Sequence, residues 1–166
     1  MSATEQLVEL VSTRNIEMFI PILREIDFGD QFLLSMLHWC GIGQRATALD
    51  YWQVFLVQSK QEVVGVSGLY RKTGMPALLC WLGWFAIRPR FRRRGFGRAA
   101  IRSLASRARA INCREIWVYT GAEDKMARNF YVSLDFEVIG PAHEWAHGRT
   151  ANPTDVVLRR KLVATV

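Results

Sequence analysis

Hydrophobic and polar positions alternate along this chain in two distinct periods. Apolar runs of strand length lie at Leu7–Val11, Trp52–Gln58, Val63–Tyr70, Ala77–Ile87, Arg114–Thr120, Phe136–Ile139 and Asp155–Leu162. Apolar residues recur three and four positions apart, which predicts amphipathic helices, over Asn15–Ile26, Gln31–Cys40, Arg98–Ala110 and Glu123–Leu134. The order of elements is therefore β-α-α-β-β-β-α-β-α-β-β.

Four local features refine this pattern. Pro21 lies inside the first helical pattern and predicts a kink or a restart, because proline lacks the N–H that an interior turn needs. Residues Ser59–Glu62 read as a hairpin turn between two strands. Gly83 marks either a bulge in the long strand or a close approach to its backbone. The segment Gly140–Pro153 is expected to be a polar loop or a ragged hairpin.

The stretch Leu78–Ala110 contains a strand, a glycine-containing loop and a helix in succession. The strand stops at Arg88-Pro89, and Gly95 and Gly97 punctuate the loop that follows. The first N–H groups of a helix have no internal partners, and the helix dipole adds partial positive charge there. Without a Cβ, the two glycines would let an anion approach the N–H groups of residues 94–98. This arrangement is typical of phosphate-binding loops.

Arginines surround the two glycines. They are Arg88, Arg90, Arg92, Arg93, Arg94, Arg98 and Arg102, and no acidic residue occurs between Arg88 and Arg114. Arginine suits bidentate phosphate contacts. The alternative is a solvated basic helix start that binds nothing in particular, and we favour phosphate binding because strand, turn and helix follow in order.

Composition predicts one domain over residues 1–166, large enough to bury a core. The formal charge of +7 is local, because ten of the 22 Lys and Arg residues lie from Arg88 to Arg114. Such a local excess indicates an anionic ligand at one place, whereas no helix-turn-helix, zinc finger or RNA-binding motif is found. No membrane span or signal peptide is expected, and three cysteines without C-x-x-C spacing argue against a disulfide framework or zinc site. We therefore expect a cytoplasmic protein that binds neither membranes nor nucleic acid and needs no metal.

Two separated motifs resemble the GNAT acyltransferase superfamily. The sequence Arg92-Arg93-Arg94-Gly95-Phe96-Gly97 matches the family's R/Q-x-x-G-x-G/A loop, and Ala86–Pro89 resembles the end of its fourth strand. Downstream, Ile116–Thr120 looks like its fifth strand, and Ala127–Phe136 fits its A-x-x-[LF]-Y-x-x-x-G-F helix pattern. The order of elements is also that of the family. The resemblance implies an α/β fold, a mixed sheet with helices on both sides.

In that family an acyl group passes directly from coenzyme A to an amine. The resemblance implies that acetyl-CoA is the co-substrate and that Tyr131 donates a proton to the leaving thiolate. Backbone N–H groups of the fourth strand would align pantetheine and polarise the carbonyl, and the loop would hold the pyrophosphate. The cofactor-binding residues implied are Phe85, Ala86, Ile87, Arg92, Arg93, Arg94, Gly95, Phe96, Gly97, Arg98 and Asp124.

The chain departs from the family pattern in three places. Trp81 lies about where the family often has a glutamate general base, and Asp124 lies where it often has an asparagine that touches the cofactor. Asp135 replaces the usual glycine before Phe136, so we expect that helix to end differently. The base is therefore open among His38, His143, Glu144, His147 and an ordered water.

The acceptor is constrained only by composition. Five tryptophans indicate an aromatic-rich pocket for a small, partly apolar amine: Trp39, Trp52, Trp81, Trp84 and Trp145. A peptide N-terminus or a lysine side chain also stays open as the acceptor. The leading prediction is an acetyl-CoA-dependent N-acetyltransferase acting on a primary amine of a small molecule or peptide. Alternatives are a non-catalytic acyl-CoA-binding sensor or partner module and, ranked lower, a nucleic-acid-binding domain. A homodimer is left open.

Overall fold

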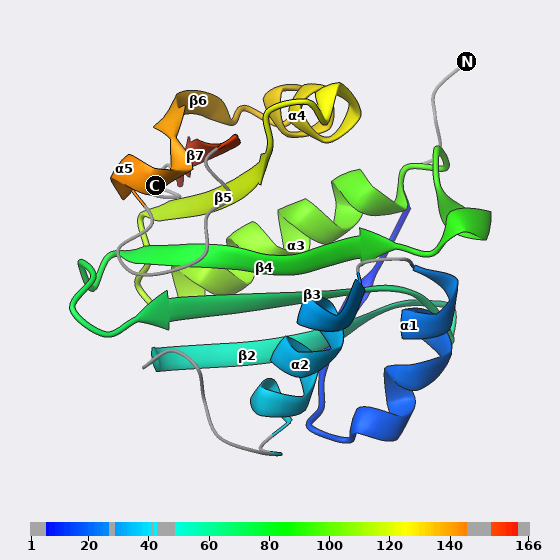
Figure 1. Cartoon of the computed structure of the whole chain (residues 1–166). Helices are drawn as coiled ribbons and strands as arrows, with labels where there is room; N and C mark the ends of the chain where they lie inside the picture. Colours follow the sequence, from blue (N-terminus) through cyan, green and yellow to red (C-terminus); the bar gives the residue numbers. More distant parts are fainter. Residues whose placement is uncertain (1–5, 27–28, 41, 43–48, 146–153, 163–166) are drawn as a thin grey trace. The chain divides into compact units, whose positions relative to one another are not determined.

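The computed structural model describes residues 6–26, 29–40, 42, 49–145 and 154–162 (Figure 1). The strands are β1 (Glu9–Ser12), β2 (Leu49–Ser59), β3 (Glu62–Lys72), β4 (Leu79–Ile87), β5 (Glu115–Gly121), β6 (Glu137–Pro141) and β7 (Asp155–Lys161). The α-helices are α1 (Ile20–Glu25), α2 (Gly29–Trp39), α3 (Phe96–Ala110), α4 (Lys125–Val132) and α5 (Ala142–Trp145), with 3₁₀ turns η1 (Ile16–Met18) and η2 (Pro89–Phe91). The predicted order of strands and helices is confirmed, and α5 replaces part of the segment expected to be a loop or hairpin.

The strands form one mixed seven-stranded sheet in the order β1-β2-β3-β4-β5-β7-β6. Strands β1, β2 and β3 pair antiparallel in sequence, and β5, β7 and β6 form a second antiparallel set. Strands β4 and β5 pair in parallel over Leu79–Trp81 and Glu115–Trp117. The sequence prediction of a mixed sheet with flanking helices is therefore confirmed.

The contacts divide the chain into two compact units. The first comprises Met1–Met75 and Leu82–Arg107, and the second comprises Pro76–Trp81 and Ala108–Val166. The loop after β4 and the start of α3 belong to the first unit, and α4 with Tyr131 belongs to the second. That the two act as one domain stays a prediction.

Burial in the first unit follows the hydrophobic pattern. Four successive residues of β2, Val54–Val57, are buried, as expected for a strand covered on both faces. The apolar face predicted for α3 is buried, with Ile101 and Leu104 at 1% and 0% exposure. Pro21 lies in the first turn of α1, where its missing N–H costs nothing, so the helical pattern restarts there.

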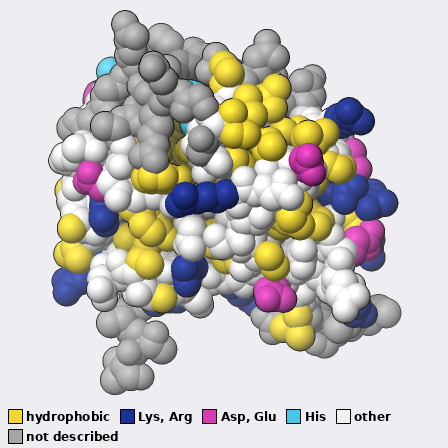
Figure 2. Space-filling view, turned by 90° about the horizontal axis from the view of Figure 1, so that it is seen from below, with side chains coloured by type: hydrophobic (Ala, Val, Ile, Leu, Met, Phe, Trp, Pro, Cys, Tyr) yellow, Lys and Arg dark blue, Asp and Glu magenta, His cyan; other side chains and the backbone are white. Residues whose placement is uncertain are grey.

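The surface of the first unit is of mixed character. The face on the side of α1 and α2 carries patches of hydrophobic side chains with Lys and Arg between them (Figure 2). Exposed large hydrophobic residues of this region include Met18, Leu33, Leu34 and Ile42. Scattered exposed apolar residues are ordinary for a folded protein. Within the described part of the chain, no helix is both long and apolar enough to cross a membrane.

Candidate functional site

The loop after β4 contains residues in the left-handed backbone conformation. Gly95 takes a φ of +88°, and Arg93 takes +60°, so two of three successive residues are left-handed. Helix α3 then begins at Phe96, two residues before the predicted start at Arg98. The first helical bond runs from the Ala99 N–H to the Gly95 carbonyl at 3.1 Å. The amides of Phe96 and Gly97 precede that bond, as the first N–H groups of a helix do.

Two aromatic rings fix this loop to the core. Phe91 and Phe96 are each 6% exposed and meet edge to face, with ring centroids 5.8 Å apart. Both pack in one cluster with Val57, Val64, Ile87 and Ala100. The side chain of Phe96 therefore faces the core, and only its backbone is left for a ligand. The sequence motif places Phe96 in the loop, and burial explains why an aromatic residue stands between the two glycines.

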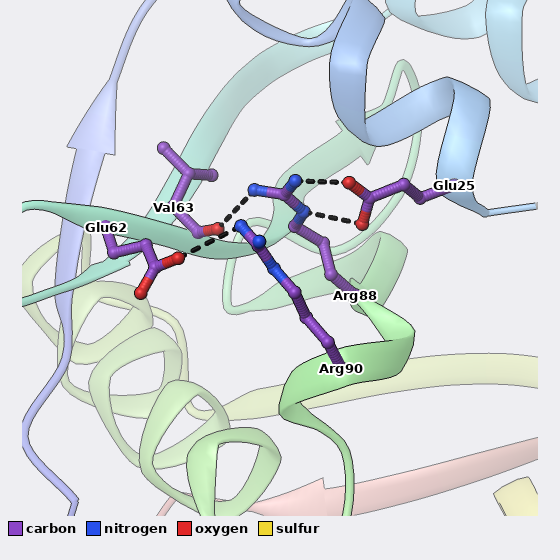
Figure 3. Close-up of polar contacts among 5 residues, drawn as sticks. All are labelled: Glu25, Glu62, Val63, Arg88 and Arg90. Carbon is purple, nitrogen blue, oxygen red and sulfur yellow. Dashed lines mark hydrogen bonds and ion pairs between the residues drawn. The ribbon is translucent and has the colours of Figure 1, made fainter.

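The first arginine of the cluster is held by a carboxylate. Arg88 donates to Glu25 of α1 through Nε at 2.8 Å and also through Nη2, and it donates through Nη1 to the Val63 carbonyl at 2.8 Å (Figure 3). The hydrogen bond to Arg88 holds the pKa of Glu25 below its usual range. The Arg88 side chain is 12% exposed. Arg88 thus fastens the end of β4 to α1 and β3, which the sequence did not predict.

Arg90 also pairs with a carboxylate, whereas Arg92 and Arg94 make other contacts. Its Nη2 lies 3.0 Å from Glu62 Oε1 (Figure 3). Arg92 donates from Nε to the Ile87 carbonyl at 2.9 Å, and Arg94 lies over the rings of Phe91 and Phe96. Arg93 is exposed, and no acidic side chain in the described part of the chain pairs with Arg93 or Arg94. Arg88 and Arg90 are thus paired with glutamates, and Arg93 and Arg94 are the better candidates for contact with an anion.

The end of β4 contains a strained residue. Trp84 takes a φ of +49°, which is an outlier for a bulky side chain and costs about 1–3 kcal/mol. Gly83 itself is explained by a close approach, since a Cβ there would lie 2.4 Å from the Trp39 ring. The interpretation of Gly83 as a close approach is therefore confirmed, whereas the alternative of a bulge stays a prediction, and the left-handed residue is its neighbour. The strain directly precedes Phe85–Ile87, the segment implied to contact the acyl group.

Tyr131 lies on α4 in the second unit and is 6% exposed. Its ring contacts those of Phe130 and Phe136, each with a centroid separation of 5.3 Å. Burial raises the pKa of the Tyr131 hydroxyl well above its usual value, and the charge of Asp124 adds to this shift. The hydroxyl therefore keeps its proton over the whole physiological range and can act only as a neutral donor or acceptor.

Asp124 has a structural task at the start of α4. Its carboxylate accepts a hydrogen bond from the Ala127 N–H at 2.9 Å, which makes it the N-cap of the helix. An asparagine in this position could cap equally well. The capping bond accounts for the residue without a ligand, and the predicted cofactor contact of Asp124 stays untested.

The helix α4 ends through Asp135 in a way the sequence did not predict. Asp135 takes a φ of +65°, the conformation that glycine adopts most readily. The Phe136 N–H then donates to the Tyr131 carbonyl at 3.2 Å, which closes the helix end. Aspartate can occupy this position because it tolerates the left-handed conformation better than most residues, and whether the helix ends differently from the family's stays untested.

The residue at the family's glutamate position is a core side chain. Trp81 has 0% exposure and packs edge to face on Trp117 at 5.5 Å. Of the proposed bases, His38 is half-buried near the end of α2, His143 and Glu144 are exposed on α5, and His147 lies outside the described residues. In the part of the chain that the structure describes, no three His, Cys, Asp or Glu side chains gather as metal ligands.

Comparison with known proteins agrees with this architecture. The model of the acetyltransferase (GNAT) family matches residues 16–136. Curated protein sequences gave no match. A GNAT-family protein from Desulfovibrio desulfuricans superposes with a TM-score of 0.72 at 13% identity, over 94% of this chain and 99% of that one.

Two further solved structures contain coenzyme A species. A GNAT acetyltransferase from Elizabethkingia anophelis with acetyl-CoA bound has a TM-score of 0.67 at 13% identity, covering 93% of this chain and 98% of that one. An acetyltransferase from Bacillus subtilis in complex with CoA has a TM-score of 0.65 at 16% identity, covering 96% and 100%. The structural neighbours share the fold, and the family model covers most of the sequence. This chain therefore belongs to the GNAT acetyltransferase family.

Proposed function

We propose that this protein transfers the acetyl group of acetyl-CoA directly to a primary amine of a small molecule or peptide. The observation that carries the proposal is the loop Arg92–Gly97, where Gly95 is left-handed and the first amides of α3 precede the helical bonds. A Cβ at Gly95 would meet only Gln6 Cγ, at 3.4 Å, so the loop surface beside it is open. This is a cradle suited to an anion.

The donor set fits a pyrophosphate. The backbone N–H groups of residues 94–98 would hold it, with Gly95 and Gly97 allowing close approach. Arg93 and Arg94 supply positive charge that no described carboxylate neutralises, and Arg92 and Arg98 complete the predicted set. Phe96 contributes through its backbone, because its ring is in the core.

In the proposed reaction, residues of this chain polarise the acetyl carbonyl, accept the proton of the amine and stabilise the leaving thiolate. The N–H groups of Phe85, Ala86 and Ile87 would donate to the acetyl oxygen as the amine nitrogen attacks the carbonyl carbon, which stabilises the charge that develops there. The carbon–sulfur bond then breaks, and the thiolate leaves. The proton lost by the amine would pass to His38, His143, Glu144, His147 or an ordered water.

Tyr131 would serve the leaving thiolate. Burial raises the pKa of the Tyr131 hydroxyl well above its ordinary value of about 10, so an alkyl thiolate is a weaker base than the tyrosinate that would form here. Full transfer of the Tyr131 proton would therefore be uphill. We infer that Tyr131 donates a hydrogen bond that stabilises the thiolate, with solvent supplying the proton later.

The remaining expectations belong to the same proposal. Cys40, Cys80 and Cys113 form no disulfide bonds, which favours a reducing compartment such as the cytoplasm. We propose that residues 1–166 work as one domain with Asp124 near the cofactor, without a metal and without nucleic-acid or membrane partners. Thermal-shift measurements with acetyl-CoA, CoA and short duplex DNA distinguish these partners, since only a ligand that prefers the folded state raises Tm.

A second candidate function is an acyl-CoA-binding module that performs no transfer. One observation favours it: Trp81, buried in the core, occupies the place where the family often has its base. Gly97→Val tests the part that both candidates share. The valine side chain should exclude pyrophosphate from the loop and sharply weaken CoA binding in a folded protein, and unchanged affinity in titration calorimetry would refute the assignment of the loop.

A further inference from the structure

A small cleft lies in the first unit at the open edge of β2. Strand β1 pairs with β2 only as far as Ser12 and Phe55, so residues 51–54 of β2 extend beyond its end. The cleft beside them has a volume of about 180 Å³. Its lining residues are Ser12, Thr13, Arg14, Trp39, Tyr51, Trp52, Gln53 and Val54.

One wall of this cleft, the indole of Trp39, is fixed in place. Trp39 is 7% exposed and contacts Tyr70 with ring centroids 5.6 Å apart. Its ring covers Gly68 and Gly83, where an added Cβ would lie 2.0 Å and 2.4 Å away. Because both positions are glycines, the indole can pack directly against the backbones of β3 and β4, and a larger residue at either position would clash with it. The cleft therefore has a preformed aromatic wall.

The lining of the cleft also carries a positive charge. The guanidinium of Arg14 lies over the Trp52 ring, 5.6 Å from its centroid. No acidic side chain in the described part of the chain pairs with Arg14, and none of the described lining residues is acidic. An arginine stacked on an aromatic face keeps its N–H donors directed outward in its plane, ready for a planar anion.

The neutral polar group of the cleft is already engaged. Gln53 Oε1 accepts from the Tyr51 hydroxyl at 2.8 Å and from Arg107 Nε at 3.0 Å. Its Nε2 donates to Ser12 Oγ at 3.4 Å. The Gln53 oxygen is therefore occupied twice, and the cleft has one charged group among its described lining residues, the Arg14 guanidinium. Its polarity favours an anion over an amine.

We propose that this cleft is a binding site for a small aromatic carboxylate. A cavity of about 150 Å³ can hold one benzene ring, so the observed volume suits a single ring with one short anionic group. The ring would pack on Trp39 and Trp52, and the carboxylate would accept from the Arg14 guanidinium. This site goes beyond the proposed acetyl transfer and does not depend on it.

The test uses two probes of the same shape. Binding of 4-fluorobenzoate and of the neutral 4-fluorobenzamide is measured by ¹⁹F NMR titration of the full chain without acetyl-CoA. With about ten heavy atoms, the carboxylate should bind with a Kd on the order of 10⁻³ M. A charge-assisted hydrogen bond makes the carboxylate about tenfold tighter than the amide. Equal affinities, or no binding of either probe, would overturn the proposal.

Two variants locate the binding. Arg14→Gln should reduce carboxylate affinity to that of the amide, and Arg14→Lys should keep part of the preference. The matched control is Arg24→Gln, which removes the same charge from the exposed face of α1 and should leave carboxylate affinity unchanged. An equal loss in Arg14→Gln and Arg24→Gln would mean that net charge, and not this cleft, attracts the anion. Because no acetyl transfer is measured, failure here leaves the proposed function intact.

Discussion

The contribution of the loop conformation to CoA binding can be tested with two glycines that have the same backbone conformation but lie inside and outside the proposed site. Gly95 in the loop and Gly74 in the turn between β3 and β4 take φ values of +88° and +85°. A Cβ at Gly74 would meet nothing within 4 Å, and one at Gly95 would meet only Gln6 Cγ at 3.4 Å. Alanine at either position is therefore strained by its backbone and not by a clash.

The expected magnitude follows from the backbone. An L-residue in the left-handed region costs about 1–2 kcal/mol relative to the right-handed one. Both Gly95→Ala and Gly74→Ala should therefore lower Tm by roughly 2–8 °C for a chain of this length. If the loop of Gly95→Ala relaxes in the free protein, CoA must restore the left-handed turn when it binds. That cost corresponds to about 5–30-fold weaker CoA affinity.

The assay is titration calorimetry of CoA with both variants and the wild type, with thermal unfolding of each. Gly74→Ala should lose stability and keep wild-type CoA affinity, because its turn is not part of the proposed site. Unchanged CoA affinity in Gly95→Ala would contradict the assignment of the loop. Equal losses in the two variants would mean that affinity follows global stability instead of loop geometry.

Three further outcomes are expected. Arg88 lowers the folded-state pKa of Glu25, so their pairing stabilises the fold above the unfolded pKa of about 4.3, and this contribution is lost as the pH falls through the folded pKa. Chemical denaturation at neutral and acid pH should therefore show that the difference in free energy of unfolding between the wild type and Glu25→Gln shrinks in acid. A difference that does not change with pH would argue against the pair. CoA should bind about two- to fivefold more tightly than dephospho-CoA at low salt, because the basic cluster would also attract the 3′-phosphate, and equal affinities would mean that no arginine reaches it. Calorimetry should show that Arg93→Gln weakens the binding of both ligands, whereas Arg90→Gln, whose arginine is held by Glu62, leaves both affinities near those of the wild type. Tyr131→Phe should lower kcat by about 10²–10³-fold with little change in CoA affinity, and full activity would remove Tyr131 from the mechanism.

The element order could be predicted from sequence because hydrophobic periods reflect burial directly. Pro21 and the buried face of α3 are examples in which a local signal matches the structure. The sequence predicts a start of α3 at Arg98, because Gly97 is typical of a loop, but the helix begins two residues earlier, at Phe96, whose ring is buried in the core. Boundaries therefore depend on packing that the local pattern does not contain.

The site was less predictable, because its contacts join distant parts of the sequence. Arg88 and Arg90 belong to a dense basic cluster, but their partners Glu25 and Glu62 lie 63 and 28 residues away. No local pattern marks such a pair. The left-handed Trp84 is likewise invisible in sequence, since bulky residues rarely adopt that conformation.

Acetyl transfer to an amine is the central claim, and product analysis tests it directly. Wild-type protein, Tyr131→Phe and Gly97→Val are incubated with acetyl-CoA and a panel of small primary amines and peptides. Thiol release and mass-spectrometric detection of the N-acetylated product are followed together. We predict that the wild type forms N-acetyl product in step with thiol release, that Tyr131→Phe is slow although it binds acetyl-CoA, and that Gly97→Val fails to bind. Tight binding of acetyl-CoA by the wild type with no acetylated amine across the panel would contradict the account and favour the non-catalytic module.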